Sequence, residues 1–177
     1  HYLPRLKALF PGQLESVDID AFYAAVNQVE SSLIRVEADE VTYNLHIILR
    51  FELERDLFAG RVSVGDLPAV WNERMEQYLG LRPPDDAQGV LQDIHWSMGG
   101  MGYFPTYTLG NLYAAQFFNQ AQKDLSDLEG QIERGELGHL KTWLNEKIHQ
   151  RGSRLRAGEL VVEVTGEKSV SYTHLRA

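Results

Sequence analysis

The sequence has no cysteine among its 177 residues. Disulfides, cysteine-bound zinc and thiol nucleophiles are therefore excluded, and a cytoplasmic location is expected because the absence suits a reducing compartment. Basic residues are few, since 17 of them stand against 25 acidic ones and leave a net charge of −8. That balance argues against nucleic acid or an anionic membrane as a partner. No apolar run approaches the ~20 residues that a membrane-spanning helix requires.

The spacing of apolar residues and helix breakers predicts an all-α fold. Helices are expected at residues 1–10, 21–33, 34–59, 63–80, 106–124, 126–137, 138–152 and, on context, 157–167. Gly60, Gly80 and Gly152 are placed to end three of these helices. Two prolines within 81–89 forbid a helix there, so a loop is expected.

The helix expected at 34–59 carries a polar stripe between apolar flanks, which include Val41 and Ile48. At 100° per residue, a stripe roughly 100° wide holds Arg35, Asp39, Thr42, Tyr43, His46 and Arg50. A helix that is apolar on two sides is mostly buried, so part of this stripe is expected to face the interior or a cleft. Two partners are open for Arg35: Asp39 one turn away, or the carboxylate of a ligand in bidentate geometry.

The segment "GVLQDIHWSMGGMGYFPTYTLGN" (89–111) concentrates polar and aromatic residues around one histidine. His95 is its only side chain that titrates near neutral pH, and the glycines of 99–102 allow sharp bends. If His95 and a tyrosine hydroxyl converge, they could donate hydrogen bonds to a developing oxyanion, an effect worth ~3–4 kcal/mol per donor. The other interpretation is structural, with His95 bonded to a backbone carbonyl and the aromatic residues in the core.

No metal site can be assembled from the spacing of the remaining histidines, because no H-x-x-x-H pair with an intervening glutamate occurs. The sequence also lacks a G-x-S-x-G elbow, a P-loop and a dinucleotide-binding glycine pattern. Motifs alone therefore predict neither a metal site nor a nucleotide site.

Two stretches resemble motifs of the Taq-type thermostable zinc metallocarboxypeptidases. "IRVEAD" (34–39) resembles I-R-x-x-A-D, and "GVLQDIHW" (89–96) resembles G-x-x-Q-D-x-H-W. Three flanking stretches are similar to the same family, in the same order: "EVTYNLHIILRFELER", "RPPDDAQG" and "GYFPTYTLGNLYAAQ". The resemblance covers residues 1–166, whereas 167–177 is expected to be a non-native, adapter-derived tail.

The resemblance implies a large, mostly helical, homodimeric zinc exopeptidase that releases single amino acids from peptide C-termini. In the family, the zinc is held by the two histidines of an H-E-x-x-H helix and by a glutamate in a later H-E-S-like motif. The general base is the glutamate of the H-E-x-x-H helix. Neither motif occurs in this sequence. Residues 1–166 are therefore expected to be the C-terminal helical part of such an enzyme, inactive alone, with zinc bound elsewhere and peptides with a free C-terminus as substrates.

The resemblance also implies roles for individual residues. Arg35 would hold the terminal carboxylate of the substrate, and His95 and Tyr103 would hydrogen-bond the carbonyl oxygen as it becomes an oxyanion. The residues that would hold the loop in place or contact substrate are Gln92, Asp93 and Tyr107.

Two other classes of function remain open. A non-catalytic helical interaction module fits the acidic composition and the missing metal ligands. A hydrolase that uses His95 with a serine nucleophile is disfavoured, because no elbow motif accompanies any serine.

Overall fold

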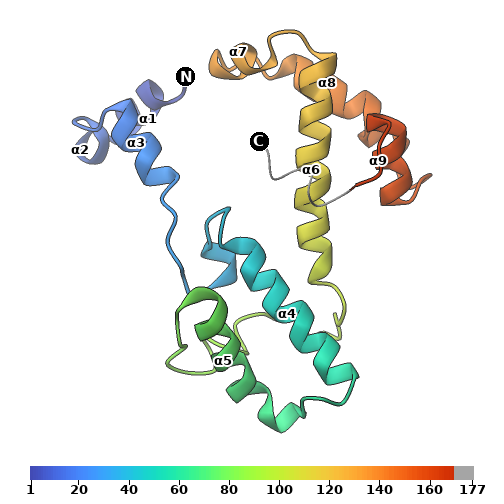
Figure 1. Ribbon diagram of the computed structural model, residues 1–177. Helices are drawn as coiled ribbons and strands as arrows, with labels where there is room; N and C mark the ends of the chain where they lie inside the picture. Colours follow the sequence, from blue (N-terminus) through green and yellow to red (C-terminus); the bar gives the residue numbers. More distant parts are fainter. Residues whose placement is uncertain (170–177) are drawn as a thin grey trace. The chain divides into compact units, whose positions relative to one another are not determined.

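The structure is a computed structural model that describes residues 1–169, and all the regular elements in that range are helical (Figure 1). The α-helices are α1 Leu3–Leu9, α2 Pro11–Leu14, α3 Ile19–Val26, α4 Tyr43–Phe58, α5 Leu67–Leu79, α6 Pro105–Asp124, α7 Leu128–Glu133, α8 Gly138–Lys147 and α9 Ala157–Thr165. The short 3-10 turns are η1 Arg35–Glu37, η2 Val64–Asp66 and η3 His149–Arg151. The predicted all-α class is therefore confirmed, while residues 170–177 of the expected tail lie outside the described residues.

The chain divides into two compact units. One unit is continuous and runs over Asp20–Leu109; the other combines His1–Ile19 with the chain from Gly110 onward. Helices α3 and α6 each contribute to both units. All the predicted site residues belong to the Asp20–Leu109 unit, called the site unit below.

The core of the site unit lies between α4 and α5. Its buried residues include Leu49 and Leu53 of α4, together with a row spaced four residues apart on α5: Leu67, Trp71, Met75 and Leu79. Each large apolar side chain that is fully buried contributes about 1.5–3 kcal/mol, so this row holds the two helices together. Gly80 ends α5 as predicted, with a φ of 71° that a side chain would strain.

The prediction of one helix over 34–59 is wrong at its start. After η1, Ala38 is extended, and α4 begins at Tyr43. The cause is Asp39, whose carboxylate accepts hydrogen bonds from the backbone N–H groups of Val41 (2.8 Å) and Thr42 (2.9 Å). Such local bonds compete with helix continuation and favour a helix start. The bond from the Thr42 backbone is the largest cause that lowers the pKa of Asp39.

The residues buried in and around α4 differ from those expected. Val41 and Ile48, expected on buried flanks, are 65% and 41% exposed. The residues that face inward instead include three polar ones at intervals of four, His46, Arg50 and Glu54, with exposures of 0%, 0% and 3%. These three, called the polar ladder below, lie on one face of α4 because residues four apart are neighbours on a helix.

The helix predicted at 21–33 is also too long, since α3 ends at Val26. The Asn27 side chain donates a hydrogen bond to the Tyr23 carbonyl (2.9 Å), which occupies an acceptor at the helix end. The following extended segment is tied to the next turn through Glu30, whose backbone N–H donates to Asp39 (3.0 Å). Asp39 therefore ties the non-helical segment before it to the start of α4.

The second unit has its own small core, made by Ala121, Leu128 and Trp143. The Trp143 indole N–H donates to Asp124 at the end of α6 (2.8 Å). The ambiguous segment 157–167 is confirmed as a helix, and its first turn is capped by Glu159, which accepts from the Arg156 backbone N–H (2.9 Å). No helix among the described residues is long and apolar enough to cross a membrane.

Candidate functional site

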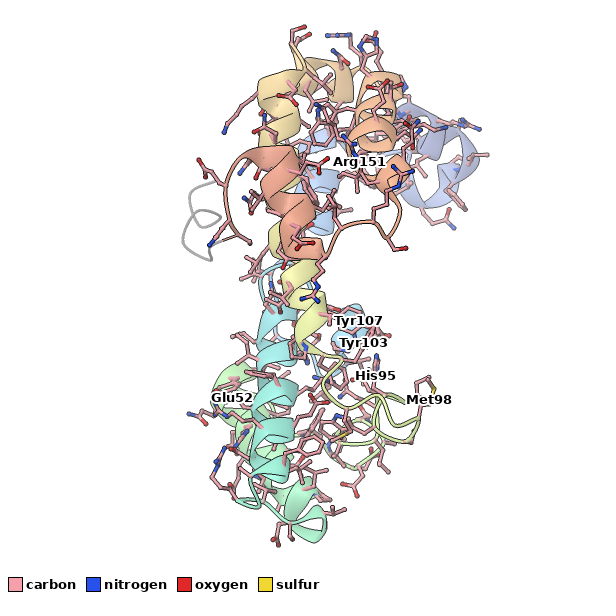
Figure 2. All side chains as sticks on the ribbon, turned by 90° about the vertical axis from the view of Figure 1, so that its right-hand side faces the viewer. Glu52, His95, Met98, Tyr103, Tyr107 and Arg151 are labelled. Carbon is pink, nitrogen blue, oxygen red and sulfur yellow. The ribbon has the colours of Figure 1, made fainter. Side chains whose placement is uncertain are left out.

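The predicted site residues come from η1, from the loop between α5 and α6, and from the first turns of α6. Figure 2 shows His95, Tyr103 and Tyr107 gathered beside the start of α6, with Met98 at the outer end of the loop. Their rings are in contact: His95 stacks on Tyr103 at 5.7 Å between centroids, and Tyr107 meets both edge-on. The structure therefore brings His95 and the tyrosines together.

Arg35 pairs with Asp93, not with Asp39 one helical turn away as one interpretation had it. Its Nη2 and Nε donate to Asp93 Oδ1 at 2.6 and 3.1 Å. Arg50 of the polar ladder reaches the other carboxylate oxygen, with Nε to Oδ2 at 2.7 Å. The side chains of Arg35, Arg50 and Asp93 are 7%, 0% and 12% exposed, so this is a buried ion triad. We call it the arginine triad.

Burial and charge act in opposite directions on the pKa values of the arginine triad. Burial raises the pKa of Asp93, but the hydrogen bond from Arg35 and the charges of Arg50 and Arg35 outweigh burial and lower it. Burial lowers the pKa of Arg50 to about 10, which the charge of Asp93 opposes. At neutral pH both guanidiniums and the carboxylate are therefore ionised.

Gln92 joins the loop to η1 and α4. Its Oε1 accepts from the Arg35 backbone N–H (2.9 Å) and from Arg50 Nη2 (2.8 Å). Its Nε2 donates to the carbonyls of Leu33 (3.0 Å) and Gln88 (2.9 Å). The Gln92 side chain therefore makes two hydrogen bonds through its oxygen and two through its nitrogen, all to protein groups. These contacts indicate that Gln92 holds the loop in place.

His95 bonds a tyrosine hydroxyl and not a backbone carbonyl. Its Nε2 lies 3.0 Å from the Tyr107 hydroxyl. Its Nδ1 has no hydrogen-bond partner among the described residues and lies 3.8 Å from Asp93 Oδ1. Of the neighbouring aromatic rings, Phe104 is 1% exposed and belongs to the interior, whereas Tyr103 is 51% exposed. The purely structural interpretation therefore fits Phe104 but does not fit Tyr103.

The turn after His95 depends on glycine at position 100. The Gly100 backbone N–H donates to the His95 carbonyl at 2.7 Å. A Cβ atom at position 100 would lie 3.0 Å from that same carbonyl oxygen, so a side chain would push the turn open. The bend expected from the glycines of 99–102 is thus what brings Tyr103 back against His95.

The model of the carboxypeptidase Taq (M32) metallopeptidase family matches residues 1–177. The chain belongs to this family. It is 53% identical over 166 residues to thermostable carboxypeptidase 1 of Thermus thermophilus. The matched segment covers 94% of this chain and 32% of that protein. It is 44% identical over 167 residues to carboxypeptidase 1 of Bacillus subtilis, covering 94% and 33%.

Solved structures agree with this assignment to the M32 family. An M32 carboxypeptidase from Deinococcus radiodurans matches with a TM-score of 0.90 and 44% identity, over 96% of this chain and 34% of that one. A carboxypeptidase from Pyrococcus furiosus matches with a TM-score of 0.92 and 42% identity, over 98% and 35%. The chain therefore spans about a third of the length of the M32 proteins that it matches, and the resemblance noted in the sequence is confirmed.

The M32 family is a metallopeptidase family, yet the described residues do not fit a metal centre. Residues 1–169 contain no group of three or more histidine, cysteine, aspartate or glutamate side chains placed to hold an ion. What this M32 chain presents is a set of hydrogen-bond donors and positive charge.

Motif reasoning missed the polar ladder of this M32 chain. The spacing places His46 and Arg50 on a polar stripe without indicating a role, and neither motif includes Glu54. Glu54 Oε1 accepts from the Trp96 indole N–H at 2.7 Å. The signal that could have found all three is the recurrence of polar residues every fourth position on an otherwise buried helix.

His46 makes the folding stability of this M32 chain depend on pH. Burial, then the charges of Arg50 and Arg35, lower the pKa of His46 from 6.5 to about 4. Between those pH values the unfolded chain binds a proton that the folded chain does not, so stability falls as the pH drops from 6.5 toward 4. The loss should reach up to about 3 kcal/mol.

The measurement is urea unfolding of the wild type and of His46→Gln at several pH values from 7 to 4. Glutamine keeps a polar side chain of similar size but cannot titrate, so the variant should lose less stability over this range. An identical pH dependence in both proteins would rule out His46 as the cause.

Proposed function

We propose that this chain forms the substrate-binding and oxyanion-stabilising part of a metallocarboxypeptidase that releases single amino acids from peptide C-termini. The proposal is supported by membership of the M32 family and by the names of its carboxypeptidase relatives. One structural observation carries it, namely the charge of the arginine triad.

The arginine triad has two positive charges and one negative charge. A buried charge without a counter-charge is unfavourable by several kcal/mol, so a site of this kind attracts an anion. Arg35 also has donors to offer. A guanidinium has five N–H groups, and Arg35 uses one on Nε and one on Nη2 for Asp93 and one on Nη1 for Tyr43. In the proposal, its remaining donors bind the terminal carboxylate of a peptide.

His95 and Tyr103 are proposed to stabilise the oxyanion. A substrate can approach Tyr103 from solvent because half of its surface is exposed, and its ring stacks on His95. Hydrogen-bond donors fixed in advance where negative charge develops lower the reaction barrier, since they need no reorganisation. Tyr107, Gln92 and Asp93 are proposed to hold these donors in place, consistent with their contacts to His95 and to the arginines.

The metal is proposed to be zinc, bound by residues of the whole protein outside this chain, because the described residues contain no ligand group for it. Residues 1–166 are proposed to be the C-terminal part of the enzyme, followed by a tail that takes no part in the reaction. A cytoplasmic homodimer is the expected state of the whole protein.

A chimera tests the proposal. Residues 1–166 of this chain replace the matching segment of the Thermus thermophilus relative, to which they are 53% identical. The chimera should release the C-terminal residue from peptides with a free carboxylate. A folded chimera that releases none would contradict the proposed function.

In this chimera, Arg35→Ala should raise the KM for peptides with a free C-terminal carboxylate by about a hundredfold, because a charged hydrogen bond is lost. The slow turnover of amidated peptides should change little. Arg35→Lys keeps the charge but lacks the planar fork, so it should give an intermediate KM. Arg134→Ala changes a half-exposed arginine of the other unit and serves as the control. Equal losses on both kinds of peptide would refute the carboxylate role of Arg35.

A further inference from the structure

Glu54 is a buried carboxylate that contacts the loop of the candidate site without belonging to it. It is 3% exposed, and its Oε1 accepts a hydrogen bond from Trp96 Nε1 at 2.7 Å. Its Oε2 is buried and has no hydrogen-bond partner among the described residues. Burying a carboxylate is unfavourable, so a glutamate here calls for an explanation other than packing.

Trp96 links Glu54 to His95. It follows His95 directly in the chain, so a shift of the Trp96 backbone moves His95 as well. Its ring is held edge-on against Trp71 and Phe104, at 6.0 Å between centroids in both cases. Phe104 in turn packs against the His95 ring at 4.4 Å. The hydrogen bond to Glu54 adds a directional contact at the indole N–H to these ring contacts.

The polar ladder therefore anchors the loop to α4 at two successive turns. Arg50 holds Asp93 and Gln92, and Glu54 holds Trp96. His95 lies between these two anchors in the sequence. Hydrogen-bond donors that act on a transition state must be placed to within a fraction of an ångström, and a displacement of about 1 Å can reduce the rate by about a hundredfold. Loss of either anchor would free one end of the segment that carries His95.

We propose that Glu54 is a positioning residue, which holds His95 in place by accepting the indole hydrogen bond of Trp96. This proposal rests on the proposed function, because it assumes that His95 acts on the substrate. The hydrogen bond, and not the negative charge, is what the loop needs.

Two substitutions in the chimera separate these effects. Glu54→Gln keeps an acceptor for the indole and removes the charge, so kcat should stay within about twofold, while the KM for free-carboxylate peptides should be unchanged or lower. Glu54→Leu removes the acceptor at similar volume, so kcat should fall about tenfold to a hundredfold, with KM changed less than about threefold. A loss of folded protein would lower the apparent kcat without changing KM, so the concentration of folded enzyme is measured for each variant and kcat is calculated from it.

The other unit supplies a matched control. Asp124 accepts from the Trp143 indole N–H at 2.8 Å, the same kind of bond at a place without site residues. Asp124→Leu should leave kcat unchanged. The indole N–H resonance of Trp96, assigned by its absence in Trp96→Phe, should shift and exchange faster with solvent in Glu54→Leu but not in Glu54→Gln.

Three results would overturn the proposal: an unchanged kcat in Glu54→Leu, an equal loss in Glu54→Gln, or an unperturbed Trp96 resonance in Glu54→Leu. If Glu54→Leu does not fold, Trp96→Phe decides, since phenylalanine keeps one aromatic ring but lacks the indole donor, and it should lower kcat with KM preserved. A wild-type chimera without activity contradicts the proposed function instead. In that case the NMR chemical shifts of the His95 ring protons still test whether Glu54 positions His95. They should change in Glu54→Leu and remain those of the wild type in Glu54→Gln.

Discussion

Asp93→Asn should lower the free energy of unfolding by about 3 to 5 kcal/mol. Among residues 1–169, Asp93 is the one carboxylate that contacts both guanidiniums of the arginine triad, at 2.6 and 2.7 Å. An asparagine of the same shape leaves Arg35 and Arg50 buried without a counter-charge. Breaking one partner of a buried ion pair is strongly destabilising for this reason, even where the intact pair contributes little.

Urea unfolding at pH 7 measures this effect, with Asp127→Asn as the matched control. Asp127 pairs with Arg134 at 3.2 Å, but its side chain is 66% exposed, and an exposed pair contributes only about 0–1 kcal/mol. Asparagine also suits the positive φ of 54° at position 127. Similar losses for both substitutions would show that burial of the arginine triad is not what makes Asp93 important.

The sequence predicts helices well where local signals agree. The segment at 63–80 has a proline near its start and Gly80 at its end. Helix α5 stops at Gly80 as predicted, although it starts at Leu67, after the 3-10 turn η2. The helix expected from 106 to 124 is α6, which starts one residue earlier at Pro105. In both cases the apolar spacing and the breakers point to the same boundaries.

The start of α4 is the case where local signals conflict. Apolar spacing continues through 34–42, but Asp39 captures the backbone N–H groups of Val41 and Thr42. A side-chain capping bond competes with helix formation at a single position, which a periodicity that averages over many residues does not register. The spacing therefore places the polar stripe on one helix, whereas Arg35 lies on η1, before α4 begins.

The spacing of residues in the sequence does not predict which side chains pair with a buried charge. Arg35 and Asp93 are 58 residues apart, and Glu54 and Trp96 are 42 apart. Two motifs resembling those of a known family suggested that Arg35 and Asp93 belong to one site, although not that they contact each other. Glu54 lies in neither motif, and only the fold brings it to Trp96.

In the chimera, His95→Phe should reduce kcat by about a hundredfold to a thousandfold, the usual loss when one oxyanion donor is removed. Phenylalanine retains a flat ring that can pack on Tyr103 and Phe104, as His95 does, while both nitrogen atoms are lost. Because the terminal carboxylate of the substrate is proposed to bind Arg35, KM should change less than about threefold. Steady-state kinetics with a free-carboxylate peptide separate kcat from KM.

The tyrosines show whether His95 acts as a donor or only supports the loop. Tyr103→Phe should lower kcat to a similar degree if its hydroxyl is the second donor. Tyr107→Phe removes the hydroxyl that holds His95 Nε2 and should have a smaller effect, because it displaces a donor without deleting one. His139→Gln, at an exposed histidine of the other unit, should leave kcat unchanged. If Tyr107→Phe lowers kcat more than His95→Phe does, the donor role belongs to Tyr107. A residue that only holds His95 in place cannot reduce kcat by more than the loss of His95 itself.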